Sequence, residues 1–229
     1  MVVLKRVNMN LKGNPTKGLI STTLGFFFGF AAVSLYGPTA IYFKETMALT
    51  PSLVGLLVAI PALSGSLLRI PFGAWVDTTG GKLPFTILLI LSVVGLGGVF
   101  IILFMFYPER MGIELYPFIL FFGFLSGCGI ATFSVGIGQT SYWFPQKKQG
   151  NALGLYAGIG NLAPGIFSMI LPLFLARFGI ISAYLAWWIF LIIGTILFIL
   201  LGCNAYYFQL VRKGVNKEDA VKKAGELGQ

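Results

Sequence analysis

The sequence predicts an all-α membrane protein, and two observations carry this prediction. Of the 229 residues, 57% are hydrophobic and only 10% are charged, which leaves too few polar side chains to cover the surface of a water-soluble domain. Six apolar runs are each long enough to cross a hydrocarbon core of about 30 Å, which takes roughly 20 helical residues. These runs are continuous, whereas a membrane β-strand would alternate polar and apolar residues over about ten positions.

The six runs follow one another with short connections. They extend approximately over residues 19–43, 53–76, 84–107, 115–142, 152–175 and 183–210. We therefore divide the chain into an N-terminal segment (1–18), a six-helix transmembrane domain (19–210) and a polar tail (211–229). In the tail, Asn216 is placed to cap a short helix.

Basic residues are concentrated on one side of the predicted helices. The N-terminal segment, the loops after the second and fourth runs, and the tail hold Lys5, Arg6, Lys12, Lys17, Lys82, Lys147, Lys148, Arg212, Lys213, Lys217, Lys222 and Lys223. The opposite loops hold only Lys44, Arg110 and Arg177. By the positive-inside rule, we expect a multi-pass protein of the cell membrane with both termini in the cytoplasm. We expect no nucleic-acid partner, because no basic run is interleaved with exposed aromatic residues in a soluble module.

The residue types argue against an enzyme. The chain contains no histidine, which excludes catalysis, metal ligation and proton relay by imidazole. Cys128 and Cys203 fall inside predicted helices, where they pack as small apolar residues. The sequence shows no nucleophile–base pair, metal cluster or phosphate loop, so we expect no catalytic residue, no metal and no cofactor.

Small residues line one face of the fifth predicted helix. Gly150, Gly154 and Gly158 recur every four residues, and Asn161 and Gly165 continue the same face. In a bilayer such a face allows another helix to approach closely, so we assign Gly150, Gly154 and Gly165 to helix packing. Asn161 lies near mid-bilayer and needs a partner, which is either another helix or a substrate. The fourth helix carries a similar small-residue set, consisting of Gly123, Gly127 and Ala131.

The second and fifth runs also align without gaps. At an offset of 99 the identities are Gly55 with Gly154, Leu56 with Leu155, Ile60 with Ile159, and Leu63 with Leu162. This offset fits two inverted three-helix repeats, in which these helices are equivalent. The alignment pairs Pro61 with Gly160 and Ala62 with Asn161, and we expect both helices to be interrupted there.

Arg69 lies inside the second apolar run, where placing a charge within the bilayer is energetically costly. It precedes Asp77 by eight residues, which places it about 12 Å inside the end of the helix. With the same helical rise of about 1.5 Å per residue, Phe133 and Asn161 lie about 15 Å from the ends of their helices. The carboxylates are at the ends of the runs or in the tail, so Arg69 has no counter-ion at its depth.

An intramembrane cation without a counter-ion is an anion site by default. The planar guanidinium of Arg69 donates paired hydrogen bonds that suit carboxylate, nitrate or nitrite. A neighbouring Phe133 ring would exclude water and select a flat ion. Snorkelling of Arg69 to the interface, or a partner among backbone carbonyls, remains open as a structural alternative.

Four stretches of the chain carry a family resemblance. SGSLLRIP (64–71), GCGIATFSVGIGQTSYWFPQKKQGNALGL (127–155) and AGIGNLA (157–163) resemble the nitrate/nitrite porters of the major facilitator superfamily. GAWVDTTGGK (73–82) is similar to the superfamily's motif between helices two and three. One departure is Ala163, where the fifth-helix signature usually ends in glycine.

The resemblance implies the amino-terminal six-helix half of a major facilitator fold, completed by a second half or a second copy. It implies a secondary transporter that moves nitrate and/or nitrite across the bilayer by alternating access. The implied anion-binding residues are Arg69, Phe133, Gly158 and Asn161, and the implied gating residues are Gly73, Asp77, Gly80 and Lys82. For the aromatic residue that the family carries in helix one, Phe30 and Tyr36 are both candidates.

Several alternatives stay open at this point. Nitrate/nitrite exchange is favoured over nitrate/proton symport, because this chain has no carboxylate or histidine at mid-membrane to carry a proton. A carrier of another small anion, such as oxalate, formate or a monocarboxylate, would also use an intramembrane arginine. A half-carrier remnant that no longer transports would keep the same fold.

Overall fold

The computed structural model describes residues 10–227, and every regular element in that part of the chain is a helix. The elements are α1 (Pro15–Ala31), η1 (Ala32–Leu35), α2 (Tyr36–Met47), α3 (Pro51–Thr79), α4 (Lys82–Phe106), η2 (Ile113–Leu115), α5 (Tyr116–Trp143), α6 (Gln146–Leu201), α7 (Tyr206–Arg212) and α8 (Lys217–Leu227). The segments α1, η1 and α2 follow one another directly and form one helical rod over Pro15–Met47.

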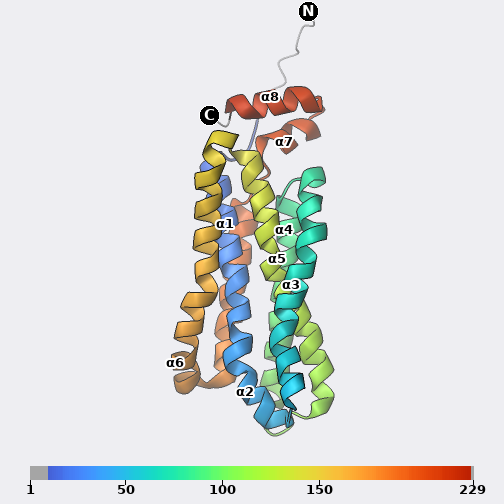
Figure 1. Ribbon diagram of the computed structural model, residues 1–229, viewed down its shortest axis with the longest axis vertical. Helices are drawn as coiled ribbons and strands as arrows, with labels where there is room; N and C mark the ends of the chain where they lie inside the picture. The colour runs from blue at the N-terminus through green and yellow to red at the C-terminus, as the bar shows by residue number, and fades with distance from the viewer. Residues whose placement is uncertain (1–9, 228–229) are drawn as a thin grey trace, which may run out of the picture.

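The long helices confirm the prediction of an all-α membrane protein. Within the described residues, five helices are long and apolar enough to cross a membrane, and they run side by side along the long axis of the molecule (Figure 1). At 56 residues, α6 would be about 84 Å long if straight, far more than a bilayer core. Gly179, with φ 75° and ψ 174°, interrupts its helical backbone, and the chain turns back there (Figure 1).

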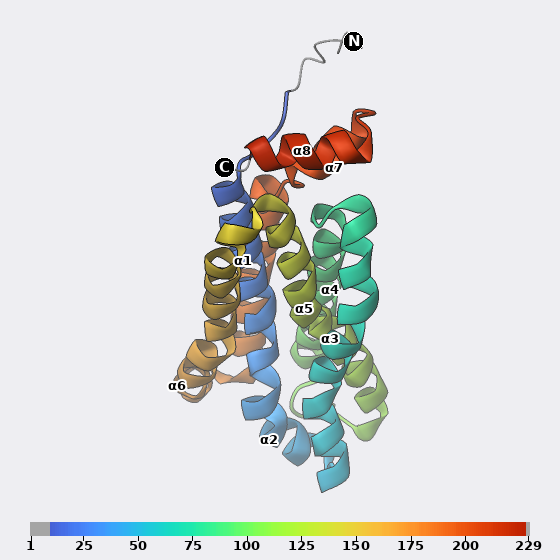
Figure 2. The same ribbon diagram turned by 45° about the horizontal axis from the view of Figure 1, so that its top comes forward.

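Helices α3, α4 and α5 begin and end within three residues of the predicted runs. The fifth and sixth predicted runs both fall on α6, which begins at Gln146 rather than Ala152. The largest difference is at the end of the sixth run. We expected that run to continue to Leu210, but α6 ends at Leu201. The carboxamide of Asn204 is used instead to bind the loop before α4, with Oδ1 accepting from the Lys82 N–H at 2.8 Å. The next helices, α7 and α8, lie across the end of the bundle (Figure 2). The predicted cap of α8 is confirmed, because Asn216 Oδ1 accepts from the Glu218 N–H at 2.9 Å.

Helix α5 lies at the centre of the bundle and packs against α3, α4 and α1. Its small residues make this possible. A Cβ added to Gly127 would overlap the Pro61 carbonyl of α3, and a Cβ added to Gly129 would lie 2.5 Å from the Gly29 carbonyl of α1. The small-residue set of the fourth predicted helix is therefore a packing surface within the chain.

The aligned stretches of α3 and α6 have matching burial. Gly55 and Gly154 are both exposed, Pro61 and Gly160 are both buried, and the positions between and after them follow nearly the same pattern. Helix α3 packs chiefly against α5, and α6 packs chiefly against α1.

The expected interruption of both helices at Pro61 and Gly160 is wrong. Helix α3 is continuous through Pro61, and α6 has non-helical dihedral angles only at Gly179. Prolines are tolerated inside membrane helices, and α3 contains both Pro61 and Pro71. Gly160 makes room for the Phe26 ring rather than for a break in the helix.

Candidate functional site

The structure brings Arg69 and Phe133 together. The guanidinium carbon of Arg69 lies 5.0 Å from the centroid of the Phe133 ring, a distance at which a cation is attracted to an aromatic face. Arg69 is half-buried, and its Nε atom is buried without a hydrogen-bond partner. Ser134 Oγ donates to the Arg69 carbonyl at 3.0 Å and thereby ties this turn of α3 to α5.

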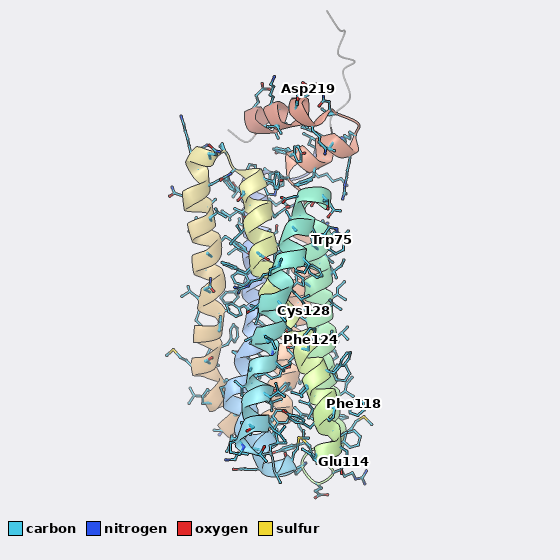
Figure 3. The ribbon with its side chains drawn as sticks, turned by 45° about the vertical axis from the view of Figure 1, so that its right-hand side comes forward. Trp75, Glu114, Phe118, Phe124, Cys128 and Asp219 are labelled. Carbon is cyan, nitrogen blue, oxygen red and sulfur yellow. The ribbon has the colours of Figure 1, made fainter. Side chains whose placement is uncertain are left out.

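Arg69 has no carboxylate partner among residues 10–227. Figure 3 shows Glu114 at one end of the bundle and Asp219 on α8 at the other, whereas Phe124 and Cys128 mark its middle. Within the described residues the guanidinium is therefore not part of an ion pair. It packs against the Phe133 ring, and its buried Nε still lacks a hydrogen-bond acceptor.

Phe133 belongs to an aromatic cluster that consists of Phe26, Phe30, Phe133 and Tyr156. These residues come from the three helices α1, α5 and α6. The ring centroid of Phe26 lies 5.4 Å from those of both Phe133 and Tyr156, and Phe30 stacks on Phe26 at 5.3 Å. The Tyr156 hydroxyl donates to the Thr132 carbonyl at 2.8 Å. Sequence reasoning missed Phe26 and Tyr156, because a phenylalanine or tyrosine in an apolar run carries no signal that separates a site from a core.

The two candidate aromatic residues of helix one have different surroundings. Phe30 is half-buried and belongs to the aromatic cluster beside Phe133. Tyr36 is 1% exposed and packs edge-on against Tyr184, with centroids 6.4 Å apart. Of the two, Phe30 is the one linked to Phe133, through the ring of Phe26 between them.

Gly158 and Asn161 lie on an exposed face of α6 and, within the described residues, do not contact Arg69. Asn161 Nδ2 donates to the Ala157 carbonyl one turn back at 2.7 Å. Nothing lies within 4 Å of a Cβ built at Gly158. The roles predicted for these two residues thus need something that approaches this face from outside the described chain.

The α6 glycines that we assigned to helix packing also lie on an uncovered face. At Gly150, Gly154 and Gly165 an added Cβ would meet nothing within 4 Å. No helix of the described chain covers this stripe, so its packing role stays a prediction about a partner.

Of the predicted gating residues, Gly73 and Asp77 lie in the last turns of α3, Gly80 follows that helix, and Lys82 is the first residue of α4. Gly80 adopts φ +81°, a backbone conformation that favours glycine, and a Cβ there would lie 2.6 Å from Asn204. Asp77 Oδ1 accepts from the Tyr142 hydroxyl of α5 at 3.0 Å. A Cβ added at Gly73 would lie 3.5 Å from Ser134, an ordinary van der Waals distance. These contacts fix the α3–α4 turn against α5.

Two carboxamides that sequence reasoning missed complete this network. Gln139 Oε1 accepts from the Gly81 N–H at 2.8 Å, while its Nε2 donates to the Cys203 carbonyl at 2.6 Å. Asn204 Nδ2 donates to the Thr79 carbonyl at 3.2 Å. The available signal was the presence of a lone carboxamide within an apolar run, since such a group must be hydrogen-bonded when buried.

Among the described residues, no group of three or more histidine, cysteine, aspartate or glutamate side chains could hold a metal ion. The site therefore offers a cation, aromatic faces and backbone groups. Groups of these kinds are able to bind an anion.

Comparison with known proteins relates the chain to membrane transporters. A sequence model of the Major Facilitator Superfamily matches residues 22–226. The chain is also similar to proteins of Staphylococcus aureus strains JH9, Newman and N315, each named "Probable nitrate transporter NarT", with 33% identity over 161 residues. These residues are 69% of this chain but only 38% of each relative, so the match covers well under two thirds of the relatives' length. Because the family match takes in all five long helices, the chain belongs to the Major Facilitator Superfamily.

Proposed function

We propose that the chain is the amino-terminal six-helix half of a secondary transporter for nitrate and/or nitrite. The observation that carries the proposal is Arg69, a half-buried guanidinium on a long apolar helix. It packs on Phe133 and has no carboxylate partner in the part of the chain that the structure describes. In a membrane protein such a cation is retained for an anionic ligand. The similarity to relatives named as nitrate transporters supports the choice of anion.

The aromatic cluster favours a flat ion. The Phe133 ring lies 5.0 Å from the guanidinium carbon, and Phe26 and the half-buried Phe30 extend the aromatic cluster behind it. A trigonal oxyanion can accept two parallel hydrogen bonds from arginine while its faces contact aromatic rings. Gly158 and Asn161 would approach the anion from α6 when the site is closed.

Six membrane spans follow if α6 is counted as two, 146–178 and 180–201, on either side of Gly179. The matching burial of α3 and α6 supports two inverted three-helix repeats. The open faces of these helices, including the glycine stripe of α6, would be covered by a second six-helix half or by a second copy. Transport would then occur by rocking of the two halves around the site.

The orientation in the cell membrane follows from charge. Both ends of the described chain lie at the same end of the bundle (Figures 1 and 2), where Lys12, Lys17, Lys82 and Arg212 also gather around one pocket. We place this end in the cytoplasm. The turn that carries Asp77, Gly80 and Lys82 is then a cytoplasmic gate element.

Exchange of nitrate for nitrite is the mechanism we favour. Proton symport needs a titratable group near the site, and the acidic residues of the chain lie at helix ends and in the tail. An exchanger needs only that the empty carrier reorients slowly, and an unpaired Arg69 at the centre of the bundle would oppose reorientation without an anion.

Counterflow tests the proposed function. The chain would be co-reconstituted in proteoliposomes with a six-span protein encoded beside it, or alone if a second copy completes it, and preloaded with nitrite. We expect rapid uptake of labelled nitrate that nitrite competes away and that formate and oxalate do not. Competition by carboxylates alone would point to a different anion, and absence of any uptake with either partner would indicate a non-transporting remnant.

A further inference from the structure

A basic pocket lies at the end of the bundle where the described chain begins and ends. It has a volume of about 350 Å³, and four cationic side chains from four separate segments line it, namely Lys12, Lys17, Lys82 and Arg212. No acidic residue lines the pocket. We call it the basic pocket.

The segments around the basic pocket are fixed by hydrogen bonds to neutral groups. The side-chain amide of Gln209 accepts a hydrogen bond from the Lys12 N–H and donates one to the Lys12 carbonyl, both at 2.8 Å. Lys82 Nζ donates to the Ile199 carbonyl at 3.1 Å, and an Arg212 nitrogen donates to the Thr79 carbonyl at 3.0 Å. Because carbonyl groups carry no net charge, the positive charge of the pocket remains uncompensated, and a phosphate group with several acceptor oxygens suits it.

A separate apolar groove lies farther along the seam between α4 and α6. This second cavity, of about 110 Å³, is lined by Ile90, Val93, Val94, Ile192, Thr195 and Ile196. Leu200, which lines the basic pocket, lies one turn from Ile196 on the same helix face. On α4, Ile90 is about 12 Å from Lys82 along the helix axis.

The seam is open to its surroundings. Ile196 and Val94 are each 50% exposed, and Leu200 is 71% exposed. In a membrane-spanning bundle, apolar side chains this exposed face lipid. Leu200 lines the basic pocket and Ile196 lines the groove, so the two cavities lie close to each other along α6.

We propose that the basic pocket binds the headgroup phosphate of an anionic phospholipid, with one acyl chain in the α4–α6 groove. A free phosphate ion would use only the pocket, whereas the groove fits the hydrocarbon part of a lipid. The basic end is also the end that we place in the cytoplasm, and the cytoplasmic leaflet is rich in anionic lipids. This proposal does not depend on which anion the central site transports.

Alkylation of Cys203 provides the test. Cys203 lines the basic pocket and is partly exposed, whereas Cys128 is 1% exposed and will not react in the folded chain. The full chain in neutral detergent would be treated with a maleimide at increasing concentrations of phosphatidylglycerol, phosphatidylcholine or inorganic phosphate. We expect phosphatidylglycerol to protect Cys203 at a far lower concentration than either of the others. Native mass spectrometry gives an independent count of bound lipid.

Variants separate the pocket and the groove from general surface charge. Lys12→Gln should raise the half-protecting concentration of phosphatidylglycerol about fivefold, the effect of one basic residue near a membrane surface. Lys222→Gln, on α8 and outside the pocket, should leave it unchanged. Ile196→Trp, which fills the groove, should weaken protection by phosphatidylglycerol but not by inorganic phosphate.

Three results would overturn the proposal. Equal protection by phosphatidylglycerol and phosphatidylcholine would remove the need for an anionic headgroup. Equal protection by inorganic phosphate would assign the pocket to a free ion. Equal effects of Lys12→Gln and Lys222→Gln would mean that only the general charge of this surface matters.

Discussion

At the scale of single residues, the contact between Arg69 and Phe133 makes the first prediction. Phe133→Ala removes the ring that lies 5.0 Å from the guanidinium and should weaken nitrate binding several-fold, since a cation–aromatic contact contributes about 0.5–2 kcal/mol. The measurement is isothermal titration of nitrate into the assembled transporter. Phe118→Ala is the matched control, because Phe118 is on the same helix but 58% exposed and lies away from the middle of the bundle (Figure 3). Equal effects of both variants would contradict the contact.

A second residue-scale prediction concerns Cys203, which follows the end of α6. Burial raises the pKa of its thiol, while the ammonium groups of Lys17 and Lys82 act in the opposite direction by stabilising the thiolate. Lys17→Gln should therefore raise the pKa further, so that less thiolate is present at any given pH. Maleimide alkylation followed against pH should shift to higher pH in this variant. An unchanged profile, or a shift to lower pH, would show that Lys17 does not stabilise the Cys203 thiolate.

At the scale of elements, Gly160 and Gly154 are two α6 glycines with opposite surroundings. A Cβ at Gly160 would overlap the fully buried Phe26 ring, whereas a Cβ at Gly154 would meet open space. Gly160→Ala should lower stability by about 1–3 kcal/mol, the usual cost of overpacking. Gly154→Ala should leave stability unchanged or raise it by up to about 1 kcal/mol, because alanine is the better helix former. Thermal unfolding in detergent measures both, and a loss of stability in both variants would contradict the packing at Gly160.

The same elements show what the sequence can predict. Apolar length predicted where the helices lie, because a bilayer demands about 20 such residues, and charge predicted that both ends share a side. The last run was assigned too far, since Tyr206, Tyr207 and Phe208 are apolar enough to continue it although Asn204 bonds to another helix. Glycine spacing predicted a face on both α5 and α6, but spacing cannot tell what lies opposite. On α5 it is another helix of this chain, and on α6 it is open.

The candidate site was predictable only in part, for a related reason. Arg69 stood out because a charge in an apolar run is costly, and counting residues from the helix ends placed Phe133 at its depth. Phe26 and Tyr156, which hold Phe133 in place, had no such signal. Their roles come from tertiary packing between helices that are distant in the sequence.

At the scale of the whole molecule, the open stripe of α6 predicts a partner. Gly154→Leu should leave the chain folded, because space is available, but should abolish association with the second half by holding the helices apart. Co-purification with a tagged second half or a tagged second copy measures this. Ile101→Phe, an enlargement at a half-exposed position on α4, is the control and should not affect association. Undiminished association of the Gly154→Leu protein would place the partner elsewhere.

The central claim is that Arg69 binds the transported anion, and the affinity of the assembled transporter for nitrate tests it most directly. Arg69→Lys keeps the charge but loses the planar pair of donors, so we expect the dissociation constant for nitrate to rise at least about tenfold. Arg110→Lys, the same change at an exposed loop position, should leave it unchanged. If the Arg69→Lys protein binds and exchanges nitrate as the unaltered protein does, Arg69 is not the anion site.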